Sequence, residues 1–149
     1  MALRSWYQAC SVLLLVTCQY VFALEPLPSE SCALTFNNGA SLTVPVARTS
    51  EQMRHGLMGR TDPSPGILFV WSKPAIRGVW MKNTEAPLSA AWIDNRGQIQ
   101  AVLDLNPLST EKRSSFLPAI AILELPRGTF ESIGVRAGSL VQGACLPRR

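Results

Sequence analysis

Several residue types and patterns that would point to a familiar chemistry are scarce in this 149-residue sequence. It contains one histidine, His55, and four cysteines, of which Cys10 and Cys18 lie near the start. One histidine and the two remaining cysteines cannot supply the usual ligands of a zinc site. No glycine-rich loop follows an expected strand and opens a helix, so no nucleotide signature is present. No complete Ser-His-Asp or Cys-His set can be assembled, and we predict no catalytic residue, metal or cofactor.

Runs of like charge are also absent. The formal net charge is only +4, and the basic residues are scattered along the chain. Nucleic-acid binding proteins usually concentrate their basic residues in a patch or stripe. We therefore expect no nucleic-acid partner.

Long apolar runs are scarce too, and the only one is ACSVLLLVTCQYVFA at residues 9–23. It follows Arg4 and ends at the small residue Ala23, which is the pattern of a secretory signal peptide cleaved after Ala23. At about 15 residues it is shorter than the roughly 20 that span a bilayer. An uncleaved anchor and lipidation at Cys18 are the alternatives, and Thr17 disfavours the second. We expect an exported bacterial protein, periplasmic or extracellular, without stable membrane insertion after cleavage.

Only Cys32 and Cys145 remain after cleavage. An even pair of cysteines in an exported protein indicates a disulfide. Closing a loop of this length stabilises a fold by roughly 4–5 kcal/mol. Two free thiols are the alternative, and they would leave a nucleophilic cysteine available.

Removal of residues 1–23 leaves a flexible Pro- and Ser-rich lead-in at 24–31 and one domain at 32–146. Thr49 and Gln52 match a capping box, which predicts a helix over Ser50–Met58 that ends at Gly59. Glycine, asparagine and proline separate short apolar segments. This pattern predicts a mostly β single domain, a β-sandwich or barrel with one or two short helices. Strands are expected at 32–36, 40–47, 66–71, 75–82, 88–94, 98–105 and 119–125, with a closing strand that ends at Cys145.

Pro45 indicates where the strand expected at 40–47 lies in the sheet. Pro45 has no amide hydrogen to donate to a ladder. It therefore suggests an edge strand, or a nitrogen that faces away from the neighbouring strand.

The segment VWMKNT, residues 79–84, suggests a binding site. In a strand Trp80 and Lys82 share a face. A flat indole beside an ammonium group can hold a sugar ring or an anion, and Asn83, Thr84 and Ser89 would add hydrogen bonds. In the alternative interpretation Trp80 is part of the core, Lys82 is solvated, and Asn83 and Thr84 satisfy backbone groups of a turn.

Other charged residues complete this set of candidates. Arg54 and Arg60 could clamp an anion beside Lys82. Glu124 interrupts the apolar segment AILEL, and a buried carboxylate there needs Lys82 or an arginine as its partner. If it lines a cleft, Glu124 is a candidate general acid or base. His55 has no local acid to orient it and is typical of a helix surface.

Three segments resemble the DUF192 family of small, mostly bacterial domains. They are MRHGLMGRTDPSPGILFVW, VWMKNTEAPLSAAWIDNRGQI and AILELPRGTFESIGVRAGSLV, and the resemblance extends over about residues 41–141. It implies a compact, mostly β, jelly-roll-like domain that is often exported and has no established activity. The family pattern usually has aspartate at the position of Ser89, so a function that needs this carboxylate would be lost here.

The sequence therefore predicts an exported β-domain that binds a small polar ligand, such as a carbohydrate or a cell-envelope fragment. The predicted binding residues are Trp80, Lys82, Asn83, Thr84, Ser89, Arg60 and Glu124. One alternative is an envelope adaptor or structural protein that acts through an interface with an unidentified protein. The other is a non-metal hydrolase-type enzyme that uses Lys82 or Glu124 as general acid or base.

Overall fold

The computed structural model describes residues 24–147, so the predicted signal peptide lies outside the described residues. The strands are β1 (Ser31–Phe36), β2 (Ser41–Ala47), β3 (Ile67–Ala75), β4 (Gly78–Val79), β5 (Leu88–Ile93), β6 (Ile99–Leu105), β7 (Arg113–Ser114), β8 (Ala119–Pro126) and β9 (Val141–Gln142). The helices are α1 (Ser50–His55) and α2 (Thr129–Ser132). This confirms a mostly β single domain with two short helices. In the part described, no helix is long and apolar enough to cross a membrane.

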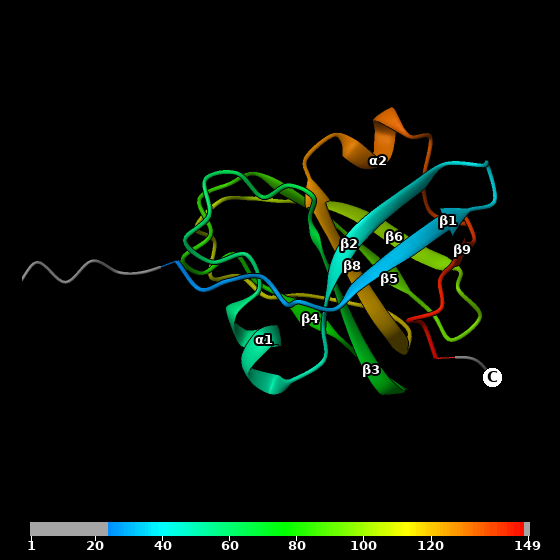
Figure 1. Ribbon diagram of the computed structural model, residues 1–149, viewed down its shortest axis with the longest axis horizontal. Helices are drawn as coiled ribbons and strands as arrows, with labels where there is room; N and C mark the ends of the chain where they lie inside the picture. The colour runs from blue at the N-terminus through cyan, green and yellow to red at the C-terminus, as the bar shows by residue number, and fades with distance from the viewer. Residues whose placement is uncertain (1–23, 148–149) are drawn as a thin grey trace, which may run out of the picture.

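Seven strands form one sheet in the order β6-β5-β8-β3-β2-β1-β9, and this sheet is curled (Figure 1). Strands β4 and β7 pair separately. Hydrogen bonds join the two ends of this order. The amide of Ile99 donates to the carbonyl of Ser139 at 2.9 Å, and the amide of Val141 donates to that of Gly97 at 2.8 Å. The sheet is thus a half-barrel whose edges meet at one end, consistent with the predicted sandwich or barrel.

Each face of the curled sheet buries its own apolar cluster. The first cluster joins residues from both ends of the strand order, such as Leu34, Val44, Ile93 and Ile99, and therefore fills the concave face. The second cluster contains Leu57, Ile67, Phe69, Trp92 and Ile122 and lies on the other face.

Alternation along β8 connects it to both clusters. Neighbouring side chains of a strand point to opposite faces. Leu123 and Leu125 belong to the concave cluster, whereas Ile122 belongs to the outer cluster. Glu124 therefore shares the outer face with Ile122.

The helix prediction is confirmed at its start and wrong at its end. Thr49 and Gln52 form the predicted capping box, but α1 ends at His55 instead of Met58. Gly56, with φ of 48°, caps the helix, and its amide donates to the carbonyl of Gln52. A positive φ is easily adopted by glycine, so Gly56, the first glycine after the capping box, ends the helix.

Three strand predictions need correction. β3 continues to Ala75, and the strand expected at 75–82 shrinks to β4 because the chain turns before Asn83, whose φ is 57°. The closing strand β9 ends before Cys145. β2 is an inner strand, not an edge, but β3 pairs only with Val46 and Ala47, so Pro45 lies just before that ladder begins.

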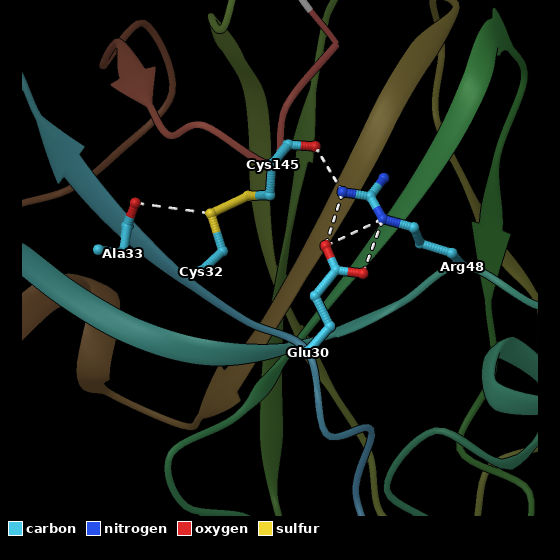
Figure 2. Close-up of a disulfide and its surroundings, with 5 residues drawn as sticks. All are labelled: Glu30, Cys32, Ala33, Arg48 and Cys145. Atoms are coloured by element: carbon cyan, nitrogen blue, oxygen red, sulfur yellow. Dashed lines mark hydrogen bonds and ion pairs between the residues drawn. A yellow bond between two sulfur atoms is a disulfide. The ribbon is translucent and has the colours of Figure 1, made fainter.

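A disulfide joins Cys32 to Cys145, with their Cα atoms 5.9 Å apart (Figure 2). Beside it Arg48 donates to the Glu30 carboxylate at 2.9 Å and to the carbonyl of Cys145 at 3.0 Å. The bond from Arg48 also lowers the pKa of Glu30. The beginning, β2 and the end of the described chain are therefore held together at one point.

Candidate functional site

A cavity of about 260 Å³ opens on the outer face of the sheet, between α1, β3, β4, the turn after β4, and β8. We call it the Glu124 cavity. Its lining residues are Met53, Arg54, His55, Gly56, Leu57, Met58, Phe69, Trp71, Gly78, Val79, Trp80, Thr84 and Glu124. Its walls are therefore largely aromatic and aliphatic.

Among residues 24–147, Glu124 is the only acid that lines this cavity. It lies opposite Ile67 of β3 and Ala90 of β5, and it is 5% exposed. Within residues 24–147 its carboxyl group takes part in no hydrogen bond and no ion pair. Burial raises the pKa of Glu124 to about 8, so the side chain is mostly protonated at neutral pH.

The predicted ion pair of Glu124 with Lys82 or an arginine is therefore wrong. Lys82 lies on the solvent side, with its Nζ 5.4 Å from the centre of the Trp80 ring. Arg77 stacks over Trp71 at 4.5 Å and donates to the carbonyl of Lys73. Lys82 and Arg77 therefore contact other groups, and the carboxyl group of Glu124 stays neutral by keeping its proton.

The backbone at Glu124 is closely packed. A Cβ atom at Gly66 would collide with the carbonyl oxygen of Glu124, and the φ of Gly66 is +97°. Only glycine fits such a close approach at a positive φ. The start of β3 therefore lies tightly against β8 and fixes the position from which the Glu124 side chain enters the cavity.

Trp80 lies at the edge of the Glu124 cavity and is 45% exposed. It pairs with Lys82, as predicted, but the two side chains meet outside any strand because the chain turns there. Their contact is a cation–π interaction, which at an exposed site contributes about 0.5–1 kcal/mol. Trp80 thus keeps part of its surface available to a ligand.

Asn83 and Thr84 form the corner beside this tryptophan. The carbonyl of Asn83 accepts a 2.8 Å bond from the amide of Gly59, which connects the corner to the chain after α1. The amide of Thr84 donates to the carbonyl of Met81 at 3.0 Å, and its hydroxyl donates to that of Lys82 at 3.4 Å. Both residues serve the turn, and Thr84 also lines the cavity.

Two predicted residues lie elsewhere. Ser89 is next to Ala90, which is opposite Glu124, so Ser89 faces the other side of the sheet. There it lines a second cavity of about 520 Å³ with Asp104 and Arg127. The guanidinium group of Arg60 donates to the carbonyl of Glu25 at 2.8 Å. The Glu124 cavity thus brings together Trp80, Thr84 and Glu124. Lys82 and Asn83 do not line it, although Lys82 contacts the Trp80 ring.

Two aromatic residues of the cavity were not among the predicted site residues. Phe69 and Trp71 are in β3, with ring centres 6.4 Å apart and nearly parallel planes. The sequence signal was their i, i+2 spacing, which places both on one face of a strand. The sequence did not show that this face is the one that carries Glu124.

Among the described residues, no three histidine, cysteine, aspartate or glutamate side chains gather in a way that could hold a metal ion. The arrangement in the Glu124 cavity instead suits a small organic molecule. A carboxylic acid can both donate and accept a hydrogen bond, and aromatic walls provide apolar contact.

Comparison with known proteins identifies the family. The model of the DUF192 family, whose description reads "Uncharacterized ACR", matches residues 33–143. The chain belongs to the DUF192 family. Among curated proteins, none matches it. The family assignment confirms the resemblance seen in the sequence and leaves the activity open.

Two solved structures resemble this DUF192 protein. A protein of Sinorhizobium meliloti 1021, named as a candidate transcription regulator, is 32% identical with a TM-score of 0.72, over 80% of this chain and 98% of that one. A protein of unknown function from Novosphingobium aromaticivorans DSM 12444 is 25% identical with a TM-score of 0.67, over 75% of this chain and 83% of that one. Both support the fold.

Proposed function

We propose that this DUF192 protein is an exported domain that binds a small polar ligand in the Glu124 cavity. The observation that carries the proposal is a buried glutamate, Glu124, whose carboxyl group has no protein partner within residues 24–147 and is open to the cavity among aromatic side chains. Such groups concentrate at sites where a ligand completes their hydrogen bonds.

The cavity limits the size and character of the ligand. Ligand pockets usually hold about 300–1,000 Å³, and the Glu124 cavity holds about 260 Å³. This volume suits one sugar ring or a molecule of similar size. Phe69, Trp71 and Trp80 supply flat apolar surfaces, and Glu124 supplies a hydrogen bond. A small ligand with both an apolar face and polar groups fits this combination.

Export and location are part of the same proposal. The segment at residues 9–23 has the pattern of a cleaved signal peptide. The Cys32–Cys145 disulfide is compatible with an oxidising compartment. The scattered basic residues give no reason to transfer the name of the Sinorhizobium relative, so we propose no nucleic-acid partner.

A matched pair of aromatic variants tests the binding proposal. Trp80→Ala removes a wall of the cavity, whereas Phe116→Ala removes a side chain that is 89% exposed and lines a different cavity. Thermal melting would be measured with monosaccharides, cell-wall fragments and organic acids. We expect a ligand-induced rise in Tm for wild type and Phe116→Ala that Trp80→Ala lacks. A panel that shifts none of the three proteins would contradict the proposal.

A second candidate function is acid catalysis by Glu124, since a carboxyl group with a pKa near 8 can serve as a general acid. Glycoside hydrolysis, however, usually needs two carboxyl groups about 5–10 Å apart. Glu124 is the only acid that lines the cavity in the described part of the chain, so binding is the better supported function. Turnover of a bound ligand by wild type, lost in Glu124→Gln, would favour the enzyme instead.

A further inference from the structure

The charges around the Glu124 cavity restrict the group that can reach its carboxyl. The charged or titratable residues that line it are Glu124 itself and, from α1, Arg54 and His55. Arg54 and His55 are exposed at the mouth, and neither pairs with Glu124. A ligand ammonium group would have to pass this basic mouth and remove the proton of Glu124. The carboxyl is therefore better matched to a neutral acceptor of a hydrogen bond.

The other walls restrict the same group further. Phe69, Trp71 and Val79 surround the cavity with hydrocarbon. A ligand group can have an oxygen that accepts a hydrogen bond from Glu124 and a methyl that packs against these walls. Such a group leaves little polar surface without a partner. An acetamido group has this form, because its carbonyl is a strong neutral acceptor and its methyl is apolar. The N–H of the acetamido group can donate a hydrogen bond to the hydroxyl of Thr84. Within the turn this hydroxyl donates only a long bond, of 3.4 Å, to the carbonyl of Lys82.

Trp80 extends this recognition to the edge of the cavity. Its ring is 45% exposed, and Lys82 lies beside it. A pyranose ring presents an apolar face that packs on indole, while its hydroxyls can accept from an ammonium group. A sugar that carries an acetamido group would thus contact Trp80 with its ring while the acetamido group points toward Glu124.

We propose that the Glu124 cavity recognises N-acetylated amino sugars through their acetamido group, with the protonated carboxyl of Glu124 as hydrogen-bond donor. This rests on the proposed function and names its ligand class. Burial supports the protonated form, since it raises the pKa of Glu124 to about 8. Affinity should therefore fall at higher pH, by up to about tenfold per unit once the carboxyl ionises.

A series of three sugars tests the proposal by calorimetric titration. N-acetylglucosamine, glucosamine and glucose differ at one position, which carries acetamido, amino or hydroxyl. We expect N-acetylglucosamine to bind at least about tenfold more tightly than either of the others, the effect of one hydrogen bond to a buried group. Because N-acetylglucosamine does not titrate between pH 6 and 9, a change of its affinity over this range reports the protein.

Variants at Glu124 separate hydrogen bonding from charge. Glu124→Gln keeps the shape and a donor, so we expect binding that no longer falls at high pH. Glu124→Leu removes the donor, and we expect N-acetylglucosamine to lose its advantage over glucose. His55→Gln removes the histidine that lines the cavity. The affinity of this variant for N-acetylglucosamine should still fall as pH rises, as in wild type.

The outcomes distinguish this inference from the proposed function. Tightest binding of glucosamine, or equal binding of the three sugars, would overturn the acetamido inference and leave ligand binding in place. If an organic acid from the wider panel binds and none of the sugars does, the acetamido inference is likewise overturned and ligand binding remains. If no compound binds, both proposals fail.

Discussion

The hydroxyl of Ser89 donates a 2.6 Å hydrogen bond to Asp104, directly across the β5–β6 ladder. Ser89 is buried, whereas Asp104 is largely exposed and its other oxygen lies 3.7 Å from Nε of Arg127. The resemblance to DUF192 implies aspartate at the position of Ser89. In this chain the facing strand places the Asp104 carboxylate within hydrogen-bond reach of Ser89.

This relationship predicts the effect of exchanging the two residues. Ser89→Asp places two carboxylates opposite each other and should lower the free energy of unfolding at pH 7 by about 2 kcal/mol, because like charges repel and one would be buried. The double variant Ser89→Asp/Asp104→Ser should recover most of this loss. Urea denaturation measures both.

Ser89→Ala is the control for this exchange, and it should cost about 1 kcal/mol through the lost hydrogen bond. If Ser89→Asp is as stable as wild type, or if the double variant is no better than the single one, the two positions do not act as a pair.

Stability should depend on pH through Glu124. In the unfolded chain its carboxyl ionises near the ordinary pKa of 4.5, whereas in the folded protein it stays protonated up to about 8. Between these values the folded state binds one more proton, so the free energy of unfolding falls as pH rises, by about 1 kcal/mol per unit. The contribution is complete below about 4.5 and gone above about 8.

Glu124→Gln removes this proton and serves as the reference for the measurement. The difference in unfolding free energy between wild type and Glu124→Gln, measured by urea denaturation from pH 5 to 8, should move steadily in favour of the variant. A difference that is constant over this range would mean that Glu124 is ionised in the folded protein.

The disulfide should contribute strongly to stability. Cys32 and Cys145 are separated by 113 residues, and closing such a loop restricts the unfolded chain by roughly 4–5 kcal/mol. The variant Cys32→Ser/Cys145→Ser should lose about this amount in urea denaturation. Because Arg48 still bonds to Glu30 and to the carbonyl of Cys145, the ends should stay docked in the folded variant. A loss below about 1 kcal/mol would contradict the entropic account.

The two corner residues should respond differently to alanine. Lys82 is exposed and meets only the Trp80 ring, so Lys82→Ala should cost less than about 1 kcal/mol. Asn83 has a φ of 57°, a conformation that costs alanine about 1–2 kcal/mol. Asn83→Gly is the matched control, because glycine accepts this φ and should be close to wild type. Thermal melting of the three variants compares them, and equal losses for Asn83→Ala and Asn83→Gly would mean that the side chain, not the backbone, matters there.

The sequence predicted the fold class because its signals are local. The capping box of Thr49 and Gln52 and the turns of asparagine and glycine all act over a few residues. Where local signals compete, prediction failed: Gly56 ended α1 before Gly59 could, and the turn at Asn83 shortened an expected strand to β4.

The site was predicted only in part because it depends on strand pairing. Glu124 was recognisable as an acid within an apolar strand, but its lack of a partner follows from where Lys82 and Arg77 point. Whether Ser89 shares a face with Glu124 depends on the register, in which Ala90 is opposite Glu124. A shift of one residue would have reversed that outcome, and sequence alone does not specify it.

The most direct test of this account is an NMR titration of the Glu124 side-chain carboxyl carbon in the ligand-free protein, with Glu124→Gln used to assign the signal. The account predicts that the carboxyl is protonated at pH 7 and ionises with a midpoint near 8. A midpoint near the ordinary value of 4.5 would mean that a charged, solvated or paired carboxylate occupies the cavity. The protonated donor, and the recognition of an acetamido group built on it, would then be wrong.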